Sequence, residues 1–344
     1  LWTIPATGSI GFEGLPFVDA VGNPSSANDA LFSFSFDWSE IGLTNTDKFD
    51  FVITYGNPND GGSNMFSSDE AFGDGIGSGN PGLNAMTFTD SKSYPNSWTG
   101  TTDTDWETAT NWTEGVPSPT HNVYIPDVTN QPTAASAVTI NKGIIKSGAS
   151  LIAQSTFVGS MTYERNLETT NWYLISSPVS GQDIDAFVTA SNLATGTQAN
   201  NVGFSNYDNT SESWTYYQSG ASGTGNFNVG QGHAVKLSAS GSVSFTGSFN
   251  DTNESLSLTN NTNGFNLIGN PYTSYISVSE LIEEDNVATG NEALLSQQTI
   301  WLWDQSANTG AGGYVPKNLA ADLEIAPGQG FFVSAGSAGT FDIT

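Results

Sequence analysis

The chain contains no cysteine, few basic residues and no long apolar run. Its 344 residues include 7 Lys and Arg, 34 Asp and Glu and 2 His, giving a formal net charge of −27. Phosphate backbones are bound by clustered cations, so nucleic acid is excluded as a partner, and an anionic membrane would repel the chain. A membrane-spanning helix needs a run of about 18 apolar residues, so no direct membrane insertion is expected. Disulfides are excluded, which is typical of a bacterial extracellular protein or of a chain that needs none.

The first part of the chain, residues 1–95, alternates bulky and polar side chains. Phe32, Phe34, Phe36 and Trp38 fall on every second position. Period-two patterning with aromatic residues is typical of half-buried antiparallel strands. Loops rich in Gly, Asn and Asp follow these runs. The pattern predicts a β-sandwich of jelly-roll type.

Residues 96–164 combine tryptophans with short apolar runs. Trp98, Trp106 and Trp112 precede a series of short β-type runs that begins at Val123. Strands at this close spacing predict a few rungs of a β-solenoid or a small meander. This segment has few other large residues, so we expect its tryptophans to form the core.

Two motifs of the second half occur twice. Residues 171–178 (NWYLISSP) match 264–271 (GFNLIGNP), and 230–235 (GQGHAV) match 328–333 (GQGFFV), at offsets of 93 and 98 residues. Such duplication is typical of stacked or strung modules rather than of one catalytic pocket. The sequence therefore predicts an all-β protein of several antiparallel sandwich-like modules, with a solenoid-like or meander segment between them. The predicted modules are residues 1–95, 96–164, 165–255 and 256–344.

The tryptophan-rich segment leads into Gly115-Val116-Pro117, and the duplicated region repeats Leu-Ile-x-x-Pro and Gly-Gln-Gly. These motifs resemble modules of large secreted and surface proteins of the Bacteroidota that are exported by the type IX secretion system. The resemblance covers residues 96–344 and defines modules rather than an activity. It implies an extracellular protein at a bacterial cell surface.

Histidine is too scarce for most hydrolytic or zinc chemistry. Only His121 and His233 are present, and the second copy has Phe331 where the first has His233, which favours packing over catalysis. Paired carboxylates such as Asp103 and Asp105 keep a glycoside hydrolase open as a third hypothesis, although loop acids usually solvate or cap turns. The Gly-Gln-Gly motif lacks the Lys and the following helix of a phosphate loop, so we interpret it as a tight turn. No catalytic residue is predicted.

Calcium binding accounts for the many loop carboxylates better than catalysis does. Hard cations take six to eight oxygen ligands, which acidic loops supply flexibly. Asp60, Asp69, Glu70 and Asp74 lie close together in a loop-rich stretch without the EF-hand spacing. We predict these four residues as the candidate ligands of a structural calcium ion, the one cofactor expected.

Two pairs of aromatic residues are candidates for ligand binding. Trp214 and Tyr216 share one face of a predicted strand, and so do Trp301 and Trp303. Exposed rings at such positions would form a glycan platform, whereas buried rings would replace the scarce aliphatic residues of the core.

The sequence favours a non-catalytic extracellular protein that acts in adhesion, or in fibre or filament assembly, at a bacterial cell surface. Its expected partners are other copies of the chain or cell-surface glycans. The alternative is a glycan-binding module of a polysaccharide-degrading system, and solvent exposure of the aromatic pairs would favour this hypothesis.

Overall fold

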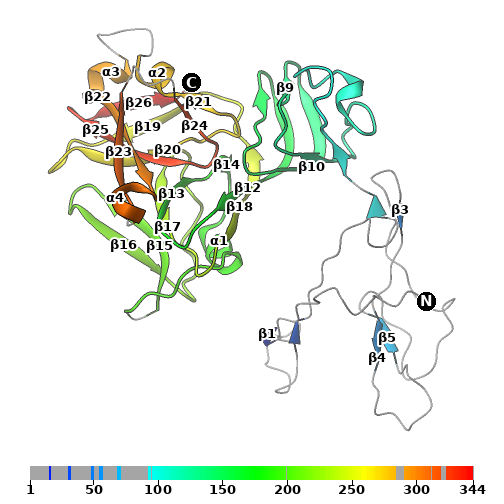
Figure 1. Cartoon of the computed structure of the whole chain (residues 1–344), viewed down its shortest axis with the longest axis horizontal. Helices are drawn as coiled ribbons and strands as arrows, with labels where there is room; N and C mark the ends of the chain where they lie inside the picture. Colours follow the sequence, from blue (N-terminus) through cyan, green and yellow to red (C-terminus); the bar gives the residue numbers. More distant parts are fainter. Residues whose placement is uncertain are drawn as a thin grey trace. The chain divides into compact units, whose positions relative to one another are not determined.

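The computed structural model describes residues 95–343 except 199, 284–289, 311 and 319–322, together with the backbone pairing of six short strands before residue 95. The chain divides into two compact units, Leu1–Tyr94 and Pro95–Thr344. It is mostly β, with several antiparallel sheets, which confirms the all-β class (Figure 1). In the described part, no helix is long and apolar enough to cross a membrane.

The first unit is described only by three pairs of short antiparallel strands. The predicted jelly-roll detail of residues 1–95 lies outside the described residues. The pairs are β1 (Leu15–Pro16) with β2 (Ala30–Leu31), β3 (Lys48–Phe49) with β6 (Lys92–Ser93), and β4 (Thr54–Gly56) with β5 (Ser68–Glu70).

The second unit begins with a solenoid-like segment. Four strands, β7, β8, β10 and β12, pair in parallel, and a second parallel pair, β9 with β11, alternates with them along the chain. Parallel pairing of successive turns is the arrangement of a solenoid, whereas a meander would pair antiparallel. The strands are β7 (Asn96–Ser97), β8 (Asn122–Ile125), β9 (Thr133–Ala134), β10 (Val138–Ile145), β11 (Ile152–Ala153) and β12 (Phe157–Leu167), and η3 (Ala109–Asn111) precedes β8.

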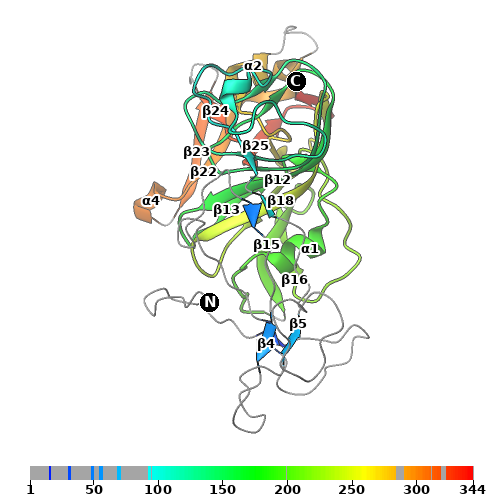
Figure 2. The same ribbon diagram turned by 90° about the vertical axis from the view of Figure 1, so that its right-hand side faces the viewer.

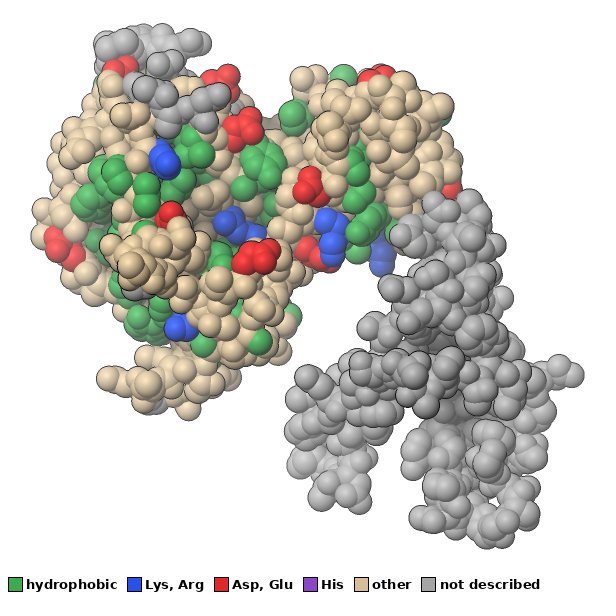
Figure 3. Space-filling model, viewed as in Figure 1, with side chains coloured by type: hydrophobic (Ala, Val, Ile, Leu, Met, Phe, Trp, Pro, Cys, Tyr) green, Lys and Arg blue, Asp and Glu red, His purple; other side chains and the backbone are tan. Residues whose placement is uncertain are grey.

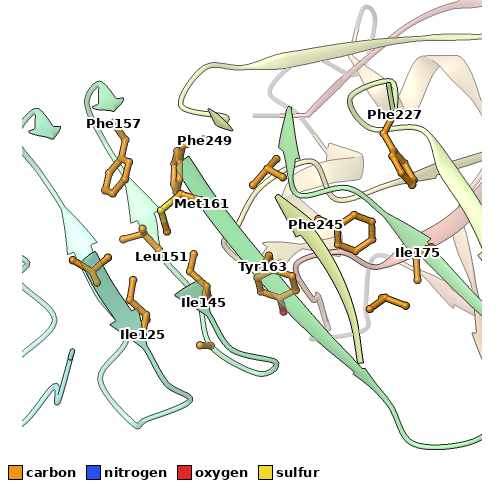
Figure 4. Close-up of a cluster of buried hydrophobic side chains, with 14 of the residues drawn as sticks. Ile125, Ile145, Leu151, Phe157, Met161, Tyr163, Ile175, Phe227, Phe245 and Phe249 are labelled. Carbon is orange, nitrogen blue, oxygen red and sulfur yellow. The ribbon is translucent and has the colours of Figure 1, made fainter. Parts of the chain in front are cut away.

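Three buried tryptophans lie at the start of this segment. The Trp112 ring packs edge to face against Trp106 at 4.5 Å and against Trp98 at 5.0 Å. Two of the indole N–H groups donate to backbone carbonyls, Trp98 to Asn130 (2.7 Å) and Trp112 to Trp106 (2.9 Å). The tryptophans are core residues, as predicted. Figure 4 shows how the aliphatic and aromatic side chains of β8, β10 and β12 continue this core toward the first copy of the duplication.

The solenoid-like segment and the first copy share one sheet. The second edge of β12 pairs antiparallel with β18 (Gly241–Phe249), which gives a six-stranded sheet of order β14-β18-β12-β10-β8-β7. The predicted boundary between residues 164 and 165 falls inside β12. One hydrophobic core runs through both parts.

Each copy contains a four-stranded antiparallel sheet, and the two sheets have the same strand order. They are β13-β17-β15-β16 and β20-β25-β22-β23. In both copies, the first strand of the sheet is followed by a short strand and a helix, which are β14 and α1 in the first copy and β21 and α2 in the second. In Figures 1 and 2, α1 lies near β15 and β16, and α2 lies at the opposite end of the duplicated region.

The first copy contains β13 (Tyr173–Ser176), β14 (Val179–Ser180), α1 (Ile184–Ala190), β15 (Asn201–Asp208), β16 (Ser213–Gln218) and β17 (Gly232–Val235). The second contains β19 (Glu254–Leu258), β20 (Phe265–Gly269), β21 (Ile276–Ser277), α2 (Val278–Glu283), α3 (Asn291–Leu294), β22 (Leu295–Asp304), α4 (Ala307–Gly310), β23 (Gly313–Asn318), β24 (Glu324–Ile325), β25 (Gly330–Ala335) and β26 (Gly339–Ile343).

The two copies exchange equivalent backbone hydrogen bonds. The Ser176 N–H donates to the Gly328 carbonyl (3.0 Å), and the Gly269 N–H donates to the Gly230 carbonyl (2.9 Å). The offsets of 93 and 98 residues map one bond onto the other. Reciprocal contacts of this kind are those of a two-fold interface, here within one chain.

The two glycines of the repeated motif have different roles. The first glycine of each motif, Gly230 or Gly328, has a φ of about +70°, as the predicted turn requires. The second glycine serves a different purpose, because a Cβ on Gly232 would lie 2.7 Å from the Ile268 carbonyl oxygen of the other copy. The tight-turn interpretation therefore holds only for the first glycine.

Candidate functional site

One candidate site lies between the two four-stranded sheets. Alternation along β22 places Trp301 and Trp303 on one face, where they oppose Phe332 of β25 and Tyr314 of β23. This face meets the equivalent face of the first copy, and the two bury a small shared cluster. Its buried members are Leu174, Ala234, Leu267 and Phe332.

An aromatic pocket of about 270 Å³ opens at one side of this interface. Phe332, only 5% exposed, is its most buried lining residue, and the rings of Tyr207 and Tyr314 stand edge to face against it at 5.0 and 5.4 Å. Figure 3 shows hydrophobic side chains reaching the surface over the sheet that contains β22 and β23. Six rings line the aromatic pocket: Tyr207 and Trp214 from the first copy, and Phe265, Trp301, Tyr314 and Phe332 from the second.

The walls of the aromatic pocket offer few hydrogen-bonding groups. The Tyr207 hydroxyl already accepts a hydrogen bond from the Asn263 Nδ2 atom (3.2 Å). Burial, and to a smaller extent the Tyr207 phenol, raise the pKa of Tyr314 to about 12, so this phenol stays neutral at physiological pH. None of the six lining residues is charged.

Two exposed carboxylates lie near the end of the hairpin that carries Tyr207 and Trp214. Asp208 is the last residue of β15, and Glu212 lies in the turn that follows. The pKa of Asp208 is lowered by hydrogen bonds, first from the Ser211 hydroxyl and then from the Thr210 N–H, so its carboxylate stays charged. This end of the β15–β16 hairpin is therefore locally negative.

The four aromatic residues predicted as a platform occupy different environments. Trp214 and Trp301 line the aromatic pocket, whereas Tyr216 packs against Trp172 outside it, with ring centroids 6.0 Å apart. Tyr216 is 41% exposed, and both pocket tryptophans are partly buried. Trp303 does not line the pocket but contacts one of its lining residues, with its ring centroid 4.9 Å from that of Tyr314.

Four lining residues were not predicted from the sequence. They are Tyr207, Phe265, Tyr314 and Phe332. A signal for one of them exists, because the repeated Gly-Gln-Gly strand has Ala234 in the first copy and Phe332 in the second. The exchange of a small residue for a large one makes the two sides of the interface unequal, and the Phe332 ring becomes part of the lining of the aromatic pocket.

The predicted calcium ligands lie in the first unit of the chain. Asp60, Asp69, Glu70 and Asp74 lie outside the residues whose side chains the structure describes. Within the described ranges, no three acidic or histidine side chains cluster as metal ligands would. Asp103, one of the paired loop acids, accepts hydrogen bonds through its Oδ1 atom from the Asp105 N–H (2.9 Å) and from the Asn111 side chain (2.7 Å). Calcium binding remains a prediction.

Both histidines take part in local structure. The Nδ1 atom of His121 accepts a hydrogen bond from the Ser118 N–H (3.0 Å). His233 is buried against Phe204 and Phe227 at 5.0 and 4.9 Å, and neither of its ring nitrogens has a hydrogen-bond partner. Desolvation lowers the pKa of His233 to about 3, so the ring is neutral at physiological pH.

A second cavity, of about 300 Å³, has a different character. Its lining includes hydroxyl, amide and carboxyl side chains as well as Tyr272 and Tyr275. Some of these groups serve the fold, since the Tyr275 hydroxyl donates to the Gly148 carbonyl (3.1 Å) and Asp251 accepts from the Phe157 N–H (2.9 Å). We call this cavity the polar cleft.

Comparisons of the chain with protein-family models, with curated proteins and with solved structures found no match. The resemblance to Bacteroidota surface modules therefore depends on the sequence motifs alone.

Proposed function

We propose that this chain is a non-catalytic extracellular protein that acts in adhesion at a bacterial cell surface, and that the aromatic pocket is its contact site. The observation that carries the proposal is the concave group of six rings contributed by both copies. Aromatic side chains that line an open cavity give up their remaining exposed area when a ligand covers them, which favours binding.

The duplication adds to this proposal, because neither copy forms the aromatic pocket alone. The first copy supplies Tyr207 and Trp214, and the second supplies the rest. Backbone hydrogen bonds from Ser176 to Gly328 and from Gly269 to Gly230 join the two copies directly. A preorganised site of this kind loses little conformational entropy when it binds.

The proposal is tested with the full chain immobilised on beads and exposed to bacterial cells. The variant Tyr314→Leu removes a ring from the edge of the aromatic pocket, where Tyr314 is 46% exposed. Tyr216→Leu is the matched control, because Tyr216 is 41% exposed on the first copy and lies outside the pocket lining. We expect Tyr314→Leu to reduce attachment and Tyr216→Leu to leave it unchanged. Equal attachment by both variants, or turnover of a polysaccharide by the wild type, would contradict the proposal.

The second candidate function is glycan binding, which the polar cleft favours. Sugars are bound by hydrogen bonds to their hydroxyls and by stacking on rings, and this cleft combines amide, hydroxyl and carboxyl groups with tyrosines. Affinity electrophoresis in gels containing polysaccharide tests this candidate. Slower migration that is lost in Tyr275→Ala but kept in Tyr314→Leu would assign glycan binding to the polar cleft, and unretarded migration in every polysaccharide would rule this candidate out.

A further inference from the structure

We infer that the aromatic pocket binds an organic cation that has no N–H group, namely a quaternary ammonium such as the trimethylammonium group of choline. This inference rests on the proposed function only in taking the aromatic pocket as the contact site. It adds the chemical class of the ligand. The reasons are the composition of the walls, the net charge of the chain and the size of the cavity.

The walls of the aromatic pocket supply π surfaces and little else. All six lining residues are aromatic, and only Tyr207, Tyr314 and the two indoles carry a polar atom. A sugar or a primary amine in this position would leave most of its hydrogen-bonding groups without partners, which costs binding free energy. A quaternary ammonium has no such groups and is attracted to the faces of aromatic rings.

The charge of the chain has the sign that a cation needs. The exposed Glu212 lies in the turn between Tyr207 and Trp214, and Asp208, at the end of β15, pairs with Ser213 on the face away from these two residues. Lys317 of β23 pairs across the sheet with Ile300, on the face away from Trp301. With a net charge of −27, the whole chain also attracts cations and repels anions.

The size of the cavity restricts the ligand further. Its volume of about 270 Å³ lies at the lower end of the range of roughly 300 to 1,000 Å³ that is usual for small-molecule pockets. A single small head group suits this volume better than an extended chain does. The ligand is therefore a compact cation, either free or at the end of a larger molecule.

The test is a calorimetric titration of the full chain with choline and with 3,3-dimethylbutanol, its uncharged isostere of the same shape. We expect choline to bind about tenfold more tightly than the isostere, in keeping with a desolvated cation–π interaction. Equal affinity for the two compounds would overturn the inference, since it would show that the aromatic pocket recognises apolar shape alone. The absence of choline binding at millimolar concentrations would overturn it as well.

Three variants locate the binding. Tyr314→Leu should weaken choline binding about tenfold, whereas Tyr314→Phe, which keeps the ring, and Tyr216→Leu should bind as the wild type does. Near-UV circular dichroism checks that each variant is folded. Choline binding that survives Tyr314→Leu unchanged would contradict the inference. Phosphocholine and phosphatidylcholine vesicles, titrated in parallel, distinguish a free ligand from a lipid head group.

The outcomes separate this inference from the proposed function. If Tyr314→Leu abolishes cell attachment but the wild type does not bind choline, the adhesive role stands and the ligand class assigned here is wrong. If choline binds in a Tyr314-dependent way but attachment is unaffected by the variant, the ligand class stands and the adhesive role of the aromatic pocket is wrong.

Discussion

Replacement of His233 by Phe, the residue at the matching position of the second copy, should stabilise the protein at acid pH. The His233 ring is 1% exposed, stacks against Phe204 and has two nitrogens without partners. The titratable group that faces it is the Tyr217 phenol, whose pKa is raised by burial and which is therefore neutral throughout the acid range. Protonation of His233 would place an uncompensated charge among aromatic rings.

The size of the effect follows from the two pKa values of His233. The folded state holds this pKa at about 3, below the ordinary value of 6.5. The unfolded chain therefore takes up the proton first, and stability is lost as the pH falls below 6.5 until the loss levels off near pH 3. Linkage gives a loss of about 2 kcal/mol at pH 5 and of about 4 kcal/mol at pH 3 relative to neutral pH. His233→Phe should remove this loss.

Urea unfolding at pH 7.5 and at pH 5 measures the effect. Carboxylates titrate alike in both proteins, so the difference between wild type and His233→Phe isolates the histidine. We expect the advantage of the variant to grow by about 2 kcal/mol between the two pH values. The reverse variant, Phe331→His, should introduce a similar acid sensitivity into the second copy. An advantage of His233→Phe that does not depend on pH would refute the reasoning.

Three further predictions concern the interface, the core and the metal. Gly232→Ala should destabilise the protein by about 1–3 kcal/mol, because the new methyl group would meet the Ile268 carbonyl. The control is Gly241→Ala, whose methyl group would have no neighbour within 4 Å. Thermal melts should show a loss of stability for the first variant and almost none for the control. Trp112→Ala should cost about 3–5 kcal/mol in denaturant unfolding, and a loss below 1 kcal/mol would contradict its role in the core. If the predicted calcium site exists, added Ca²⁺ should raise the melting temperature of the wild type but not of Asp69→Asn.

The sequence correctly predicted features that depend on the side chains of a single segment. Alternation placed Trp301 and Trp303 on one face of β22. The composition of residues 96–164 indicated that Trp98, Trp106 and Trp112 are buried, and they are. These features depend on side-chain periodicity and size, which the sequence displays directly.

Features that depend on contacts between distant segments were not predicted. The spacing of short strands could not decide between a solenoid and a meander, because it does not show in which direction neighbouring strands pair. The role of Gly232 was missed since its neighbour, the Ile268 carbonyl, belongs to the other copy. The aromatic pocket was only half predicted for the same reason: Tyr207 and Phe332 meet across the interface, 125 residues apart in the chain.

The most direct test of this account compares cell attachment by the full chain carrying Tyr314→Leu with attachment by the chain carrying Tyr216→Leu. The account predicts a clear loss for the first variant alone, because Tyr314 lines the aromatic pocket and Tyr216 does not. Attachment that is equally strong in both folded variants would contradict the claim that this pocket is the contact site.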